Sequence, residues 1–242
     1  MRLILFLNII RMCQNMINFI NIKFEQSIPN FHFLGDANLP YKIHQLVECA
    51  QKDENSHARI LWRMDSLNRS IPNILVQVNS EINKERLLSK IKNLNLTANI
   101  EYKMLEPNFE NGQTFMFKLR ANPTKAMPVL GSKTSKRIPL GVVKDKSIPC
   151  EEKNKIIYTE LKKWLDSKAK NHGFSIINCD FFKEDCHELE SILQGKFSSY
   201  FNSVLFMGTL KVTDAVLFKH AIQNGIGSAK SFGFGMLSIK RI

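Results

Sequence analysis

The sequence predicts an α+β protein built from two tandem ferredoxin-like (RRM-like) domains, each with the element order β-α-β-β-α-β. Two observations lead to this prediction. Short stretches that alternate apolar and polar residues are interspersed with longer stretches whose apolar residues recur at helical spacing. The same order occurs twice along 242 residues, a length that suits one large domain or two small ones. We therefore expect domains at 16–106 and 113–242, preceded by a poorly ordered extension over residues 1–15.

The first half of the chain contains one complete set of these elements. Four stretches are typical of strands: 19–25, 57–64, 73–79 and 96–105. Two amphipathic helices are predicted at 38–51 and 80–94, with Asn38 and Ser80 as their N-caps. In the order of the chain these elements give β-α-β-β-α-β.

The second half repeats the order, with a long insertion after its first strand. Strands are predicted at 114–122, 174–182, 203–212 and 231–241. Helices are predicted at 151–173 and 213–225, the second capped by Thr213 or Asp214. The insertion, residues 123–149, is basic and contains several prolines and glycines.

The charge balance favours a polyanionic partner. Thirty-four lysines and arginines face 22 aspartates and glutamates, for a net charge of +12. Such an excess suits nucleic acid or an anionic membrane surface, although an ordinary basic surface is the simpler alternative. The apolar run near the N-terminus is too short to span a bilayer. A membrane-surface protein that uses this run is the weakest of these hypotheses.

The five cysteines predict neither a disulfide framework nor a zinc site. Their number is odd, no C-x-x-C pair occurs, and the spacing of Cys179, Cys186 and His187 matches no familiar metal site. This usage is typical of the reducing cytoplasm. No metal and no cofactor is predicted.

A glycine-rich stretch near the C-terminus, "NGIGSAKSFGFGMLSI", surrounds a single lysine. It follows a predicted helix and precedes a strand, whereas a P-loop or Rossmann turn has the opposite order. Lys230 and Ser231 are the predicted phosphate contacts. The glycines, Gly225, Gly227, Gly233 and Gly235, could equally serve as a helix C-cap and as points of close backbone approach.

A second basic segment lies between residues 118 and 146. Asp145 is its single acid. Its basic residues are Lys118, Arg120, Lys125, Lys133, Lys136, Arg137, Lys144 and Lys146. Because A-form RNA is recognised mainly through its shape and phosphates, a basic hairpin with its tip near 131–141 would suit an RNA stem. The alternative is a solvated loop with ordinary lysines.

Four separated segments carry a resemblance to a known family. They are "PYKIHQL" (40–46), "FKLRANPTK" (117–125), "FMGTLKVTDAVLF" (206–218) and "GIGSAKSFGFGMLSI" (225–239). Together they resemble the CRISPR repeat-processing endoribonucleases, specifically the CasE subfamily of type I-E systems. The match spans residues 16–242, although residues 50–110 contain no recognisable signature. The family is built from two tandem ferredoxin-like domains, in agreement with the element order.

The resemblance implies metal-independent cleavage of CRISPR precursor RNA at the base of the repeat stem-loop. The ribose 2′-hydroxyl would attack the adjacent phosphorus and leave 5′-hydroxyl and 2′,3′-cyclic phosphate ends. The resemblance selects His44 for proton transfer and Tyr41 for orientation, because an imidazole can act as acid or base near neutral pH. It also implies that the guide RNA stays bound and joins type I-E Cascade subunits. The alternative is a non-catalytic subunit that binds structured RNA within a ribonucleoprotein complex.

Overall fold

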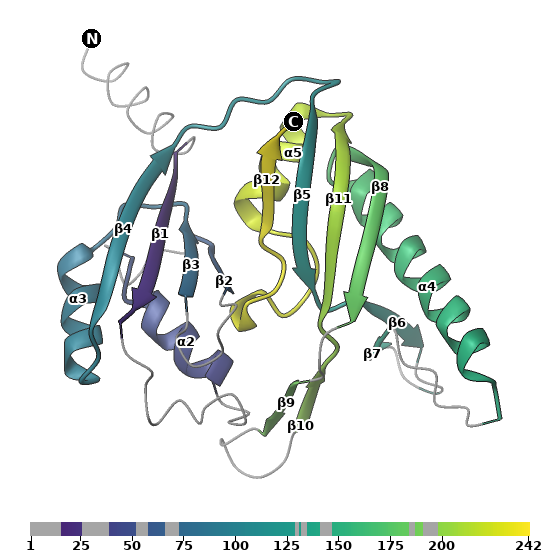
Figure 1. Cartoon of the computed structure of the whole chain (residues 1–242), viewed down its shortest axis with the longest axis horizontal. Helices are drawn as coiled ribbons and strands as arrows, with labels where there is room; N and C mark the ends of the chain where they lie inside the picture. The colour runs from purple at the N-terminus through teal and green to yellow at the C-terminus, as the bar shows by residue number, and fades with distance from the viewer. Residues whose placement is uncertain are drawn as a thin grey trace. The chain divides into compact units, whose positions relative to one another are not determined.

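The computed structural model of the chain is described here for the residues drawn in colour in Figure 1. The described residues are 16–25, 39–51, 58–65, 73–128, 131, 135–140, 147–183, 187–190 and 198–242. The predicted extension over residues 1–15 lies outside them. The chain forms two compact units, the first comprising Met1–Asn108 with Lys230–Gly233, and the second Phe109–Ala229 with Phe234–Ile242.

The first unit contains a four-stranded antiparallel sheet in the order β2-β3-β1-β4. Its strands are β1 (Ile17–Phe24), β2 (Ile60–Met64), β3 (Asn73–Val78) and β4 (Ala98–Leu105). Two helices pack with it, α2 (Leu39–Glu48) and α3 (Lys84–Asn93). The order of elements is therefore β-α-β-β-α-β, with the first and third strands at the centre of the sheet, as in a ferredoxin-like domain.

Buried and exposed side chains alternate toward the end of the central strand β1, and the buried ones belong to the core of the first unit. Ile20, Ile22 and Phe24 of β1 are buried in one cluster with apolar residues of α2, α3 and β3. The intervening Lys23 is exposed and forms an ion pair with Glu101 of β4, at 2.7 Å. This contact, together with a hydrogen bond from Asn21, lowers the pKa of the Glu101 carboxyl.

The second unit repeats the arrangement with a sheet in the order β12-β5-β11-β8. Its strands are β5 (Thr114–Ala121), β8 (Phe174–Lys183), β11 (Val204–Val212) and β12 (Leu237–Arg241). Helices α4 (Cys150–Asn171) and α5 (Ala215–Asn224) lie on one face of this sheet, behind it in Figure 1. The predicted α+β class with two ferredoxin-like sheets is thus confirmed.

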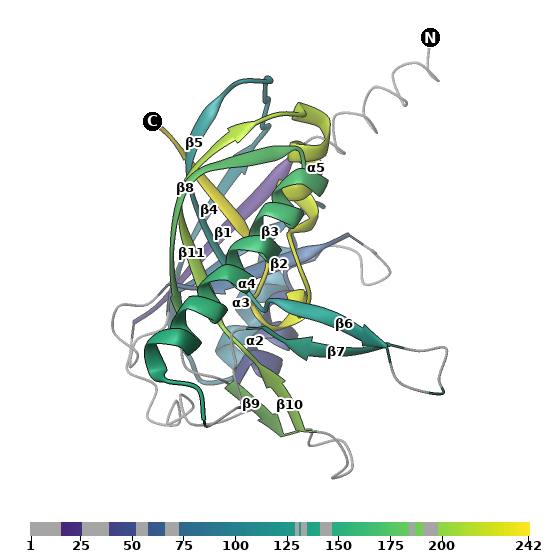
Figure 2. The ribbon, with the colours of Figure 1, turned by 90° about the vertical axis from the view of Figure 1, so that its right-hand side faces the viewer.

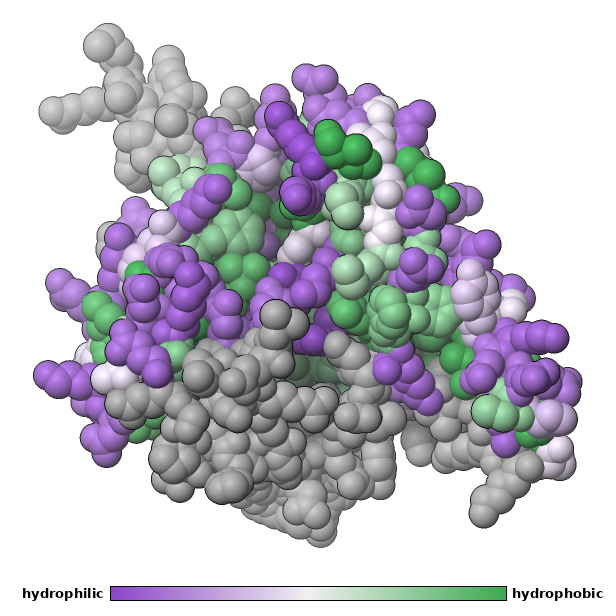
Figure 3. Space-filling view, viewed as in Figure 1, coloured by the Kyte–Doolittle hydropathy of each residue, from purple (hydrophilic) through white to green (hydrophobic). Residues whose placement is uncertain are grey.

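The open face of the second sheet mixes basic and apolar side chains. Phe115, Phe117 and Leu119 of β5 are buried, whereas the alternating Met116 is exposed. Met207 of β11 and Phe182 of β8 are also exposed. Figure 3 shows hydrophobic patches over these strands beside hydrophilic ones.

The basic insertion forms a two-stranded hairpin and leads into α4. Strands β6 (Thr124–Pro128) and β7 (Ser135–Pro139) pair antiparallel, so the hairpin predicted in this segment is confirmed. The second strand of the pair lies within the segment expected as the tip, residues 131–141. Figure 2 shows the hairpin extending away from the sheet of its unit. A second hairpin, β9 (His187–Glu190) with β10 (Ser198–Phe201), was not anticipated from the sequence.

Two predicted boundaries are wrong. Helix α3 begins at Lys84, because Asn83 accepts a hydrogen bond from the amide of Arg86 and serves as the N-cap in place of Ser80. The last strand begins at Leu237 instead of residue 231, because Lys230–Phe232 form a turn of 3₁₀ helix, η2. The positive φ angles of Gly233 and Gly235 interrupt an extended path.

Candidate functional site

Helix α2 carries both residues that the resemblance selected as catalytic. Ile43, Leu46 and Val47 are buried in the core of the first unit, so the helix is anchored along one face. Tyr41 is 43% exposed on the other side. His44 lies one turn further on and is partly buried, between these two environments.

The imidazole of His44 presents its two nitrogens very differently. Its Nε2 atom lies 3.1 Å from Oε1 of Glu48, and the His44 side chain is 22% exposed. Its Nδ1 atom is buried and has no hydrogen-bond partner among the described residues. Nε2 is therefore the nitrogen that a ligand arriving from solvent can reach once the exposed Glu48 side chain moves.

Part of the glycine-rich stretch belongs to the first unit. The short helix η2, Lys230–Phe232, packs against α2 and β2, and it lies in the yellow segment of Figure 1. The indole Nε1 of Trp62 donates a hydrogen bond to the carbonyl oxygen of Ser231 at 3.1 Å. The whole stretch was expected in the second domain, whereas these contacts place Lys230 and Ser231 with the helix that carries His44.

The glycines of this stretch have structural roles. Gly225 is the C-cap of α5 with φ +70°, and its amide donates to the carbonyl of Ala221. Positive φ angles recur along the stretch, at Gly225, Gly227, Gly233 and Gly235. At Gly233 a Cβ atom would lie 2.8 Å from the ring of Trp62, so a larger residue cannot fit without displacement. The C-cap named as an alternative for these glycines is thus confirmed, whereas the close approach at Gly233 is to a side-chain ring and not to another backbone.

The remaining basic residues selected from the sequence lie in the second unit. Lys118 and Arg120 alternate with buried residues of β5 and are half-buried on the face of the sheet away from that core. Lys125 lies on β6, where its Nζ atom is 3.0 Å from Oε1 of Glu160 in α4. Arg137 is exposed on β7.

The hairpin register places two described basic residues on opposite faces. Lys125 pairs with Ile138 and Arg137 pairs with Ala126, so their side chains alternate. The side chain of Lys136 lies outside the described part of the structure, as do Lys133, Lys144 and Lys146 entirely.

Buried amides hold the root of this hairpin, and no local pattern in the sequence predicts them. Asn122 Oδ1 accepts a hydrogen bond from the amide of Asn202 at 3.1 Å, and the side-chain amide of Asn202 donates to the carbonyl of Leu140. Ser228 of the glycine-rich stretch donates to the carbonyl of Asn122 at 3.1 Å. Asn122 and Asn202 are almost fully buried. Asn122 lies in the segment "FKLRANPTK", which entered only as part of the resemblance, and Asn202 lies outside all four segments that carry it.

The described residues contain neither a metal site nor a membrane-spanning helix, the two other features considered from the composition. Within them, no group of three His, Cys, Asp or Glu side chains is arranged to hold a metal ion. None of their helices is long and apolar enough to cross a membrane. Burial raises the pKa of the Cys179 thiol to about 11, and Cys186 lies outside the described residues.

The first unit brings together an imidazole, a phenol and a turn of 3₁₀ helix that carries a lysine. An imidazole with one reachable nitrogen can accept or donate a proton near neutral pH. A phenol one helical turn away can donate a hydrogen bond, and a lysine can neutralise developing negative charge. These groups suit a reaction at a phosphodiester, which defines the protein as a candidate nucleic-acid-processing enzyme.

Comparisons with known proteins agree with this class. The sequence model of a family described as CRISPR associated protein matches residues 22–241. The chain therefore belongs to this family of CRISPR-associated proteins. A curated relative from Thermus thermophilus, "CRISPR-associated endoribonuclease Cse3", is 25% identical over 84% of this chain and 91% of its own length.

Solved structures show the same fold. Cse3 of Thermus thermophilus, bound to an RNA representing a pre-cleavage complex, has a TM-score of 0.68 at 23% identity, covering 93% of this chain and 99% of that one. Cas6e from Escherichia coli has a TM-score of 0.61 at 20% identity, covering 93% and 100%. A chain of a CRISPR RNA-guided surveillance complex has a TM-score of 0.54 at 19% identity. The match covers 93% of this chain and 100% of that one.

Proposed function

We propose that this protein is an endoribonuclease that processes CRISPR precursor RNA into guide RNA. The proposal rests on membership of the CRISPR-associated family and on similarity to Cse3, which is named an endoribonuclease. The net charge of +12 supports an RNA substrate, because phosphate contacts dominate the affinity of proteins for nucleic acids.

The proposed reaction is transesterification at the base of the repeat stem-loop. The 2′-oxygen attacks the adjacent phosphorus and loses its proton to a base, the P–O5′ bond breaks, and the departing 5′-oxygen receives a proton. His44 carries out one of these proton transfers through Nε2, and Tyr41 orients the 2′-hydroxyl or a phosphate oxygen. A single positioned acid or base contributes about 10²–10⁴-fold to such a rate.

The observation that carries the proposal is the packing of η2 against α2 within one compact unit. It supports a site in which Lys230 and Ser231 contact the phosphate while His44 and Tyr41 act on its neighbours. The ammonium of a lysine stabilises the extra negative charge of the phosphorane, which exists only in the transition state.

The hairpin β6–β7 and strand β5 are the proposed binding surface for the RNA stem. Lys118, Arg120, Lys125 and Arg137 would contact phosphates, as would Lys133 and Lys136. A paired stem presents its phosphates on a regular A-form helix, which a two-stranded ribbon can follow. We further propose that the product RNA remains bound and that the protein joins type I-E Cascade subunits in the cytoplasm, since a similar chain occurs in a surveillance complex.

The decisive experiment incubates the full chain with the CRISPR repeat RNA encoded beside its gene and analyses the product ends. We expect a single cut, 5′-hydroxyl and 2′,3′-cyclic phosphate ends, and unchanged activity in EDTA. His44→Ala should lower the cleavage rate by about 10²–10⁴-fold while leaving stem-loop binding intact. Replacing the ribose at the cut by 2′-deoxyribose should abolish cleavage of a still-bound RNA.

Each outcome decides between the enzyme and the non-catalytic subunit. Binding of the repeat RNA without any cut by the wild-type protein would favour the RNA-binding subunit. Wild-type cleavage by His44→Ala would remove His44 from the mechanism, and cleavage of the 2′-deoxy substrate would exclude the 2′-hydroxyl as nucleophile.

A further inference from the structure

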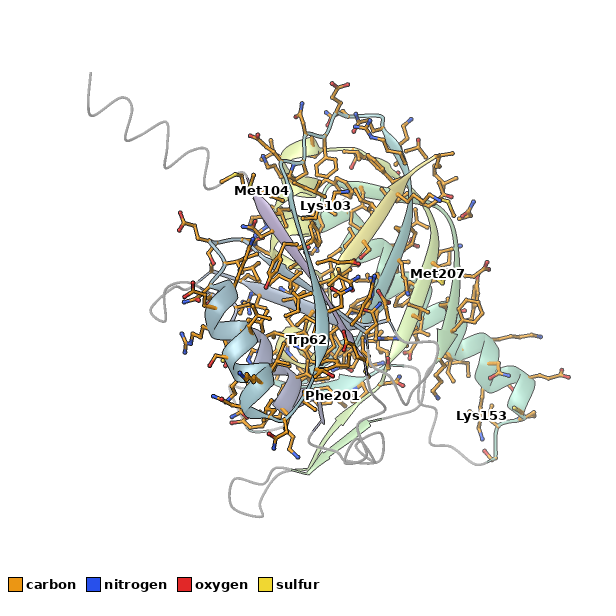
Figure 4. The ribbon with its side chains drawn as sticks, turned by 60° about the vertical axis from the view of Figure 1, so that its left-hand side comes forward. Trp62, Lys103, Met104, Lys153, Phe201 and Met207 are labelled. Atoms are coloured by element: carbon orange, nitrogen blue, oxygen red, sulfur yellow. The ribbon has the colours of Figure 1, made fainter. Side chains whose placement is uncertain are left out.

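We propose that Trp62 is the positioning residue that holds Lys230 and Ser231 beside helix α2. The proposal extends the cleavage function proposed above and rests on it. Trp62 lies on β2 and is 3% exposed, with its side chain in the core cluster of the first unit (labelled in Figure 4). Its role would be to fix a segment that lies 169 residues further along the chain.

The first contact is a directional hydrogen bond. The indole N–H of Trp62 donates to the carbonyl oxygen of Ser231 at 3.1 Å. A buried indole N–H left without an acceptor is costly, so the bond favours one position of the η2 backbone. The indole is itself held by the strand, since Trp62 pairs with Val76 in the β2–β3 ladder.

The second contact is the close approach of the ring to Gly233. A Cβ atom at this position would lie 2.8 Å from Cζ3 and 2.9 Å from Cη2 of Trp62. The φ angle of Gly233, +85°, is also one that other residues rarely adopt. The indole therefore meets the chain at Ser231 and again at Gly233, one residue beyond the end of η2.

These two contacts constrain the short segment that carries the lysine. Lys230 directly precedes Ser231, and the amide of Gly233 donates to the carbonyl of Lys230 at 3.3 Å. A lysine side chain is long and flexible, so its effective position depends on where its backbone is held. Small displacements from a reactive geometry can reduce a rate by about 100-fold.

The alternative is that Trp62 serves only as core. Its ring packs in the same cluster as Ile20 and Val76, and that packing does not need the indole N–H. Trp62→Phe retains an aromatic ring and removes the N–H donor. Gly233→Ala leaves Trp62 unchanged and places a methyl group against its ring, which displaces the segment. A positioning role predicts the same kinetic defect in both variants.

The test is a double-mutant cycle measured on the full chain with the repeat RNA. Single-turnover cleavage at saturating RNA is measured for the wild type, Trp62→Phe, Gly233→Ala, Lys230→Ala and the double variant of Trp62→Phe with Lys230→Ala. We expect Trp62→Phe to lower the rate constant by about three- to tenfold, the value of one hydrogen bond, with little change in RNA affinity. Gly233→Ala displaces the same segment by steric contact with the Trp62 ring, so it should also lower the rate constant with little change in RNA affinity. In the Lys230→Ala background, Trp62→Phe should have no further effect.

Trp164→Phe is the matched control, since Trp164 is the other tryptophan of the chain and lies in α4 of the second unit. It should lower the melting temperature without lowering the rate constant. The proposal is overturned if Trp62→Phe cleaves at the wild-type rate, or if its effect multiplies fully with that of Lys230→Ala. Either result leaves the proposed function standing as long as the wild-type protein cuts the repeat RNA, whereas binding of that RNA without any cut by the wild type would refute the function itself.

Discussion

The carboxylate of Glu48 lies 3.1 Å from Nε2 of His44, one helical turn away on α2. The other imidazole nitrogen, Nδ1, is buried and has no hydrogen-bond partner among the described residues. The Glu48 carboxylate therefore covers the nitrogen that a ligand could reach. An RNA phosphate approaching this nitrogen would meet the negative charge of Glu48. In the proposed enzyme, Glu48 must therefore leave His44 before cleavage.

Glu48→Gln should strengthen RNA binding and leave the chemical step nearly unchanged. The contact between Glu48 and His44 is exposed on the Glu48 side, so losing it costs at most about 1 kcal/mol. We expect the RNA concentration at half-maximal rate to fall by about two- to fivefold, with a saturated rate within threefold of wild type. Glu85→Gln, the same change at an exposed position of α3, should produce neither effect. A tenfold loss of the saturated rate would instead make Glu48 part of the catalytic machinery.

Tyr41→Phe tests whether the phenol takes part in orientation. Tyr41 is 43% exposed, so removing its hydroxyl should change the free energy of unfolding by less than about 0.5 kcal/mol. The loss of one hydrogen bond to the substrate should lower the saturated cleavage rate by about tenfold. Tyr158→Phe, at a half-exposed position in α4, is the control and should cleave as the wild type does. A wild-type rate for Tyr41→Phe would remove Tyr41 from the site.

The ion pair between Lys125 and Glu160 predicts opposite effects of two substitutions on RNA binding. Lys125→Ala should weaken stem-loop binding and reduce the slope of log affinity against log salt by about one. Glu160→Gln should strengthen binding, because it releases the ammonium held at 3.0 Å and removes an acid near the hairpin. Titrations at several salt concentrations measure both quantities, with the exposed Lys92→Ala of α3 as control. Equal slopes for Lys125→Ala and wild type would exclude a phosphate contact at Lys125.

Asn122→Ala should loosen the root of the β6–β7 hairpin. It leaves the buried amide of Asn202 without its acceptor, which costs about 1–3 kcal/mol of unfolding free energy. Asn178→Ala removes a similar bond to the amide of Thr209 at an exposed position, so we expect a smaller loss of about 0.5–1 kcal/mol. Denaturant unfolding compares the two variants. Equal losses would show that burial does not set the cost.

Thiol reactivity should separate Cys179 from Cys150. Burial raises the pKa of Cys179 from 9.0 to about 11, and only the thiolate reacts, so its reactive fraction at neutral pH is small. Iodoacetamide labelling followed by mass spectrometry should modify the exposed Cys150 first. Above pH 9 the unfolded thiol ionises before the folded one, so Cys179 should lower stability as pH rises. Faster labelling of Cys179 than of Cys150 in the folded protein would contradict this expectation.

The periodic elements of the fold were predictable because their signals are local. Alternating residues such as Phe115, Phe117 and Leu119 reveal which face of a strand is buried, wherever the strand pairs. The N-cap of α3 was misassigned because Ser80 and Asn83 are both good caps, and only the actual hydrogen bond distinguishes them. The β9–β10 hairpin was missed because its strands are short, with four residues each.

The sequence by itself determined the two ferredoxin-like repeats, the basic insertion and the family signatures, because each depends on residue types at fixed spacing along the chain. Only the tertiary structure decided that Lys230 and Ser231 belong with Trp62 and the helix of His44. It also decided that Glu48 faces the imidazole and that buried asparagines hold the hairpin. These relationships join segments up to 169 residues apart or depend on side-chain direction, and no local periodicity encodes either of them.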